Sequence, residues 1–115
     1  FSIFLTPGGY KLTPLYDVMS VAPYPEFSAH KIKLAMAAGN NRHYRIMEIQ
    51  PRHFYQTGQK AGLRKQDMDD VFSDITAQLD DTLEKVAKLG IESGVPESTL
   101  ESILHGVKNR VSLIE

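Results

Sequence analysis

The chain has 115 residues, of which 42% are hydrophobic and 23% charged, and its formal net charge is -1. This composition is ordinary for one globular domain, and the lack of cysteine excludes a disulfide framework and a cysteine zinc site. No apolar run reaches the roughly 18 residues of a spanning helix and no signal-peptide pattern opens the chain, so we expect a cytoplasmic protein without a membrane partner.

The first thirteen residues predict a β-hairpin. The apolar run Phe1 to Leu5 is followed by a Thr-Pro-Gly-Gly turn. Pro7 presets the second position of that turn, and Gly8 can take the positive φ that a type II turn requires. We therefore expect Phe1 to Leu5 to pair with Tyr10 to Thr13.

The returning strand leads to one acidic residue, Asp17. Tyr10, Leu12 and Leu15 follow a two-residue repeat that predicts a half-buried strand, which Pro14 confines to a sheet edge or strand end. Asp17 is then expected where the strand stops. A carboxylate placed there suits Mg²⁺, which takes one or two carboxylates and fills its other positions with water and phosphate oxygens. A turn residue or helix cap is the alternative.

The middle of the chain predicts a loop and a second hairpin. Val21 to Ser28 contains two prolines among aromatic residues, which indicates an extended loop. Lys31 to Met36 alternates polar and apolar residues and predicts a strand, with a turn at Gly39 to Asn41 and a return at Tyr44 to Met47. A short helix through Ala37 is the alternative.

Three helices are predicted after residue 50. Pro51 suits the first position of one helix, which Gly62 ends. A second helix should run from about Lys65 to Leu89 with Gly90 as its cap, and Pro96 opens a third that packs antiparallel to it. Apolar residues repeat at three and four in both long helices: Met68, Val71, Phe72, Ile75, Leu79, Leu83 and Val86, then Leu100, Ile103, Leu104, Val107, Val111 and Ile114.

These elements predict a mainly α-helical α+β fold. We expect one domain over residues 1–115, with a hairpin and loop region at 1–50 that carries the candidate metal-binding Asp17, and a helical subdomain at 51–115.

Charge is distributed unevenly along the chain. Residues 42–65 hold six Lys and Arg against one acid, whereas residues 67–84 hold seven acids and no base. The basic block could bind the phosphates of a nucleotide or of DNA, and a solvated face is the alternative. His53 lies in this block, and we interpret it as a structural histidine rather than a general base because no partner for it is visible in the sequence.

Four stretches resemble the C-terminal part of HipA-type serine/threonine kinases, the toxins of bacterial toxin and antitoxin pairs. They are FSIFL at 1–5, YKLTPLYDVMS at 10–20, KLAMAAG at 33–39 and PRHF at 51–54. The first two are specific to the family, and the other two support them. The resemblance implies that Asp17 binds Mg²⁺ on the phosphates of ATP, as the DFG aspartate does in other kinases, with Tyr16 beside the nucleotide.

The resemblance also implies that the chain is a fragment of a larger kinase. In the family, a catalytic loop with the base Asp and a metal-binding Asn comes immediately before the segment that matches Phe1 to Leu5. A glycine-rich phosphate loop and a strand lysine paired with a helix glutamate are also absent from the sequence. We therefore expect half of a metal site, with no catalytic residue in this chain.

Partners follow from the same resemblance. It implies a HipB-like helix-turn-helix antitoxin, operator DNA bound through the antitoxin complex, and a protein substrate such as an aminoacyl-tRNA synthetase. The toxin would be cytoplasmic, and nucleoid-associated when in complex. Basic residues near the helix opened by Pro51 touch DNA in the family, which makes Lys60, Arg64 and Lys65 the expected phosphate or partner contacts.

Overall fold

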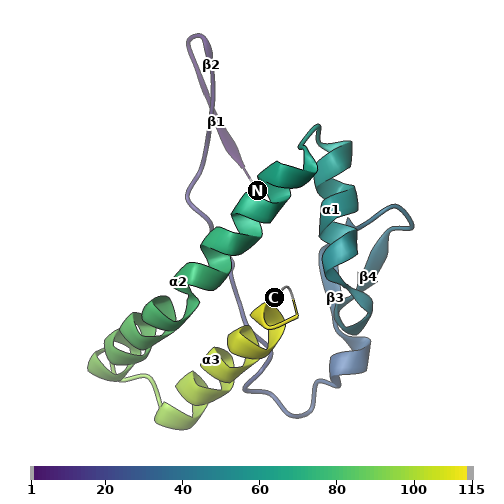
Figure 1. The fold of residues 1–115 in the computed structure, drawn as a ribbon. Coiled ribbons are helices and arrows are strands. Elements are labelled where there is room, and N and C mark those ends of the chain that lie inside the picture. The colour runs from purple at the N-terminus through teal and green to yellow at the C-terminus, as the bar shows by residue number, and fades with distance from the viewer. Residues whose placement is uncertain (1, 114–115) are drawn as a thin grey trace.

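The structure, a computed structural model, describes residues 2–113. Two small antiparallel sheets are followed by three helices (Figure 1). This architecture confirms the predicted mainly helical α+β class. The elements are β1 (Ile3–Thr6), β2 (Gly9–Leu12), the 3-10 helix η1 (Ala29–Lys31), β3 (Lys33–Ala38), β4 (His43–Arg45), the 3-10 helix η2 (Ile46–Glu48), α1 (Pro51–Lys60), α2 (Lys65–Glu92) and α3 (Glu97–Val111).

The first hairpin forms as predicted, although Phe1 lies outside the described residues. Ile3 lies opposite Leu12, and Thr6 lies opposite Gly9. Gly8 has a φ of +92°, in the region that a type II turn requires at its third position. The turn chemistry of the sequence therefore sets the register of this hairpin.

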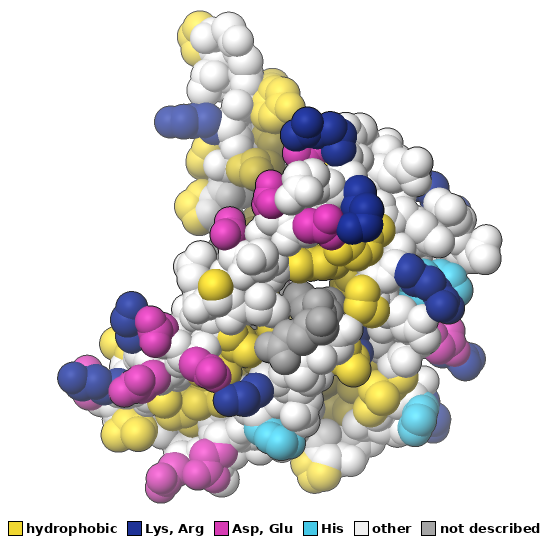
Figure 2. Space-filling model, in the orientation of Figure 1, with side chains coloured by type: hydrophobic (Ala, Val, Ile, Leu, Met, Phe, Trp, Pro, Cys, Tyr) yellow, Lys and Arg dark blue, Asp and Glu magenta, His cyan; other side chains and the backbone are white. Residues whose placement is uncertain are grey.

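The prediction that this strand is half-buried is wrong. Tyr10 and Leu12 are 72% and 71% exposed, and Leu15 lies beyond the end of β2. Burial needs a surface to pack on, and this two-stranded sheet projects away from the helices (Figure 1). Hydrophobic side chains consequently stand along the projecting hairpin in the space-filling view (Figure 2).

The second hairpin is also confirmed, with shifted bounds. β3 begins at Lys33 because Lys31 belongs to η1, and η2 starts directly after Arg45. The ladder is irregular between its pairs Lys33 with Arg45 and Ala38 with His43. The alternative of a short helix through Ala37 is therefore wrong.

Helix α1 has the predicted ends and supports the second hairpin. Pro51 occupies its first position. At the other end, the Leu63 N–H donates to the Gly58 carbonyl, which closes the helix in a Schellman motif around Gly62. The Thr57 hydroxyl accepts a hydrogen bond of 2.9 Å from the Gly39 N–H and so fixes the β3–β4 turn on α1.

Helices α2 and α3 pack antiparallel as predicted, but Gly90 does not cap α2. The helix continues to Glu92. The turn that closes it contains Gly94, whose φ is +77°, and the Val95 N–H donates to the Gly90 carbonyl. Gly90 serves packing instead, because a Cβ on it would lie 2.9 Å from a methyl group of Leu100.

The buried apolar residues lie where these elements meet. Within residues 2–113 they are Ala38, Ile49, Met68 and Leu100. Met68 of α2 packs on the bare backbone of Gly58 in α1, while Leu100 packs between α2 and α3. Ile114 of the predicted α3 stripe lies outside the described residues. None of the helices within this range is long and apolar enough to cross a membrane.

Candidate functional site

Residues 13–18 leave the first hairpin and are tied back to its base. The Thr13 N–H donates to the Ser2 carbonyl at 3.0 Å, and the Thr13 hydroxyl donates to the same oxygen at 3.2 Å. The Tyr16 hydroxyl lies 2.7 Å from the Ser2 hydroxyl. These contacts hold Tyr16 beside the start of the chain.

Asp17 does not end the strand, which corrects its predicted place. β2 stops at Leu12, and residues 13–16, which have no regular secondary structure, separate it from Asp17. Asp17 itself has a φ of +53°. Aspartate is among the few non-glycine residues that adopt this left-handed conformation readily. Its exposed carboxylate makes no hydrogen bond or ion pair with any residue in 2–113. The carboxylate is therefore available to a ligand.

A cavity of about 490 Å³ opens beside Tyr16 and Asp17. Two of the residues that line it, Ala35 and Met36, belong to β3 and were not predicted as site residues. Both residues lie in the KLAMAAG stretch at 33–39, one of the four stretches that carry the family resemblance. That stretch was the only signal in the sequence that could have indicated them as site residues. The complete lining is Ser2, Leu12, Thr13, Pro14, Leu15, Tyr16, Asp17, Val18, Ala35 and Met36.

The residues around Asp17 fit a shared metal site rather than a complete one. No group of three His, Cys, Asp or Glu that could hold a metal occurs in the described part of the chain. Magnesium is commonly bound by one or two protein carboxylates, with waters and phosphate oxygens as the remaining ligands. Asp17 can therefore contribute one charged ligand to such a site.

The family model described as the HipA-like C-terminal domain matches residues 1–83. The chain belongs to this family. Kinases of the HipA family use ATP and Mg²⁺, and Tyr16 and Asp17 both lie within the matched residues. Helix α3 lies beyond them.

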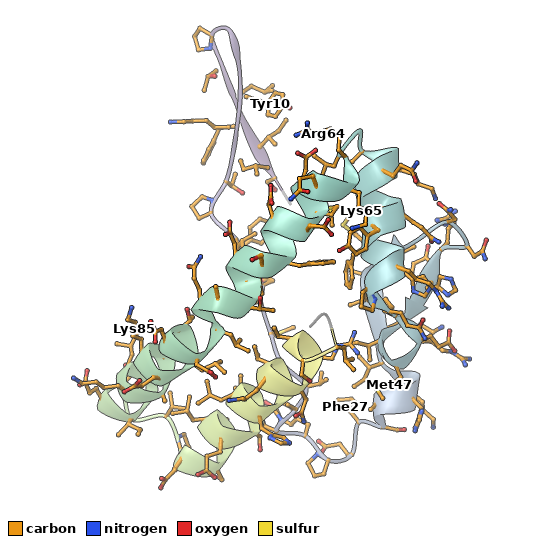
Figure 3. All side chains as sticks on the ribbon, viewed as in Figure 1. Tyr10, Phe27, Met47, Arg64, Lys65 and Lys85 are labelled. Carbon is orange, nitrogen blue, oxygen red and sulfur yellow. The ribbon has the colours of Figure 1, made fainter. Side chains whose placement is uncertain are left out.

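The three predicted phosphate or partner contacts of the HipA-like chain lie at the end of α1 (Lys60) and at the start of α2 (Arg64 and Lys65). The Lys60 ammonium donates to the Gly39 carbonyl at 3.2 Å. Arg64 and Lys65 stand at the end of α2 nearest α1 (Figure 3) and pair with Asp67 at 2.6 Å and Asp69 at 2.7 Å. Acids and bases consequently alternate on this surface (Figure 2).

These ion pairs leave the cations accessible. The Arg64 and Lys65 side chains are 80% and 79% exposed. Hydrogen bonds from Arg64 hold the pKa of Asp67 below its usual value, and hydrogen bonds from Lys65 and Tyr55 do the same for Asp69. Ion pairs this exposed to water contribute little to stability, so both cations can exchange their partners for a bound anion.

His53 is built into the fold, in keeping with a structural role. Its ring is buried and stacks on His43, with 3.9 Å between the ring centroids. The Gln50 N–H donates to His53 Nδ1 at 3.2 Å, and the Arg52 Nε–H donates to His53 Nε2 at 3.4 Å. Burial, His43 and Arg52 together lower the pKa of His53 below 6.5.

Acidification should therefore destabilise this region. The unfolded chain takes up a proton on residue 53 near the ordinary histidine pKa, whereas the folded chain resists it, so the free energy of unfolding falls as the pH drops below about 6.5. Urea denaturation followed by circular dichroism should show this fall, and His53→Gln should reduce its slope.

The matched control is His30→Gln, which changes an exposed histidine outside α1. It should keep the wild-type pH dependence. Equal slopes for the wild type and His53→Gln would show that His53 does not resist protonation.

Proposed function

We propose that this HipA-like chain is the C-terminal portion of an ATP-dependent serine/threonine kinase that acts as the toxin of a toxin and antitoxin system. The observation that carries the proposal is Asp17. Its carboxylate is exposed and unpaired within residues 2–113, lines a cavity of about 490 Å³ and belongs to the segment matched by the family.

The proposed roles of the site residues follow from their positions. A bound Mg²⁺ would supply positive charge that stabilises the phosphates of ATP. Asp17 would supply one ligand oxygen to the ion. Tyr16, held by its hydrogen bond to Ser2, would form the wall beside the nucleotide. The catalytic base would come from a part of the kinase that precedes Phe1.

The exposed apolar side chains of the first hairpin support the proposal that this chain is part of a larger protein. Leu5 and Tyr10, which face each other across the two strands, are 84% and 72% exposed, and Leu12 is 71% exposed. Neighbouring apolar side chains left open to water mark a surface that another part of a protein covers. In our proposal the remainder of the kinase covers it.

The proposal extends to the partners of HipA-type toxins. These are a HipB-like helix-turn-helix antitoxin, operator DNA bound through that antitoxin, and a substrate such as an aminoacyl-tRNA synthetase. Lys60, Arg64 and Lys65 are the proposed contacts to DNA or to the partner, supported by their exposure to solvent.

Nucleotide binding in two forms of the protein tests the proposal. The full-length protein should bind ATP in a magnesium-dependent way and transfer labelled phosphate to serine or threonine. The isolated 115-residue chain should bind ATP weakly or not at all in calorimetry, because one carboxylate cannot replace a phosphate loop and a strand lysine.

Two results would contradict it. Micromolar, magnesium-dependent ATP binding by the isolated chain would mean that it holds a nucleotide site of its own. A full-length protein that takes up no phosphate from ATP in the presence of Mg²⁺ would refute the kinase assignment.

A further inference from the structure

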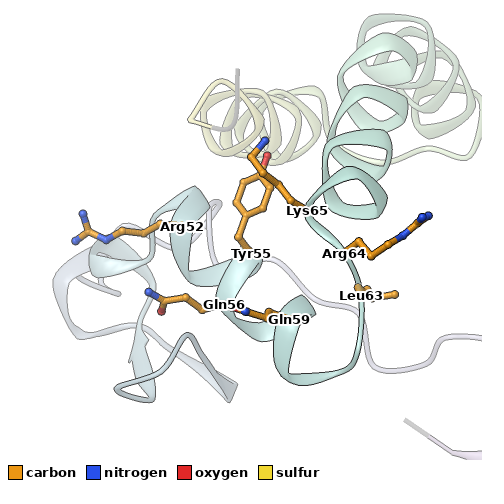
Figure 4. Close-up of a pocket in the computed structure, with 7 residues that line it drawn as sticks. All are labelled: Arg52, Tyr55, Gln56, Gln59, Leu63, Arg64 and Lys65. Carbon is orange, nitrogen blue, oxygen red and sulfur yellow. The ribbon is translucent and has the colours of Figure 1, made fainter.

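A groove between α1 and the start of α2 is separate from the cavity at Asp17. Its volume is about 500 Å³, and it shares no lining residue with that cavity. We call it the basic groove; it is lined by Arg52, Tyr55, Gln56, Gln59, Leu63, Arg64 and Lys65 (Figure 4). Helix periodicity explains the α1 wall, because residues 52, 55, 56 and 59 share one helix face.

The lining presents hydrogen-bond donors and cations without an acid. Three of the seven lining residues are Arg or Lys, and two are glutamines. The carbonyl oxygen of Gln56 accepts a bond of 2.9 Å from the Asn40 N–H, which leaves its NH₂ group as a donor. Arg52 forms no ion pair with any residue in 2–113, and its one hydrogen bond there, from Nε to His53 Nε2 at 3.4 Å, leaves its two terminal NH₂ groups as donors. The groove is therefore suited to an anionic group.

The two acids beside the groove are already paired, Asp67 with Arg64 at 2.6 Å and Asp69 with Lys65 and Tyr55. Asp69 accepts hydrogen bonds from Lys65 at 2.7 Å and from the Tyr55 hydroxyl at 2.5 Å. The Lys65 ammonium also lies 5.5 Å from the centre of the Tyr55 ring. These contacts fix the α2 wall, while Arg52 stands at the opposite side of the groove (Figure 4).

We propose that the basic groove binds an acidic peptide segment of a partner protein, with a carboxylate at Arg52 and an apolar side chain against Leu63. Arginine binds carboxylates through two parallel hydrogen bonds. Leu63 is 45% exposed and, with the Tyr55 ring, provides an apolar surface beside the cations. A peptide offers both kinds of group within a few residues.

Charge beyond the groove favours a peptide over duplex DNA. Residues 67–84 of α2 carry seven acids and no base. A duplex has one phosphate charge per roughly 1.7 Å of its axis, so a duplex laid along α2 would meet these acids as soon as it left the groove. A short acidic segment ends before it reaches them.

Fluorescence anisotropy with a labelled peptide of glutamate and leucine tests the inference on the purified chain. We expect binding that weakens at least tenfold when glutamine replaces every glutamate of the probe. Arg52→Gln should weaken binding of the acidic peptide to a similar degree. Gln59→Glu, which adds a negative charge to the groove at an exposed position, should do the same.

Matched variants separate this inference from the kinase proposal. Lys31→Gln removes a cation outside the groove, and Asp17→Asn changes the other cavity; both should bind the peptide as the wild type does. Equal binding of the glutamate and glutamine probes would overturn the inference. Tighter, Arg52-dependent binding of duplex DNA than of the acidic peptide would also overturn it and assign the surface to nucleic acid.

Discussion

Replacing Asp17 by Asn in the full-length protein is expected to lower the proposed autophosphorylation at least about a hundredfold, the scale on which charge stabilisation of a transition state is lost. Asparagine keeps the size of the side chain and tolerates the left-handed backbone, here with a φ of +53°. The substitution therefore removes the negative charge of a metal ligand without straining the loop. The initial rate of phosphate transfer from labelled ATP at saturating Mg²⁺ measures the effect.

The control is Glu26→Gln, which removes a charge of the same sign from the exposed loop before η1. Its rate should stay close to that of the wild type, and circular dichroism should show that both variants are folded. A near wild-type rate for Asp17→Asn would exclude this residue as a magnesium ligand.

Leu100→Ala is expected to lower the free energy of unfolding by about 2–5 kcal/mol, the usual cost of a buried leucine truncation. Leu100 is only 7% exposed and lies directly against Gly90 of α2. The truncation leaves a void between two helix backbones that are already in close contact, so little room remains for collapse. Urea denaturation of the purified protein should show a lower midpoint at an unchanged m-value.

Leu89→Ala provides the comparison for this effect. Leu89 lies in α2 next to Gly90 but is 64% exposed, so its truncation should change the free energy of unfolding by no more than about 0.5 kcal/mol. Equal effects of the two truncations would show that Leu100 does not pack a core between α2 and α3.

The features that the sequence predicted correctly depend on few neighbouring residues. The turn at Gly8, the start of α1 at Pro51 and the end of α1 at Gly62 are all confirmed. The fixed φ of proline and the positive φ open to glycine act within one turn of chain. Hydrophobic periodicity similarly predicted both long helices, because the 3.6-residue repeat is a property of the helix itself.

The errors concern burial. Alternation in Tyr10 and Leu12 indicated a half-buried strand, yet the hairpin has no layer to pack on within residues 2–113. Glycine often marks the end of a helix, but α2 continues through Gly90. The residue is glycine because Leu100 occupies the space that a side chain would fill. Neither outcome can be read from neighbouring residues.

The sequence by itself determined the elements, the family and one candidate ligand, Asp17, because motif residues and local backbone preferences are written in consecutive positions. Only the tertiary structure decided what surrounds that ligand and what forms the basic groove. Ala35 and Met36 reach the Asp17 cavity from another hairpin, and Arg52 shares a groove with Lys65 from another helix. The physical reason is that cavities and charge clusters form between segments distant in sequence, at separations that only packing fixes.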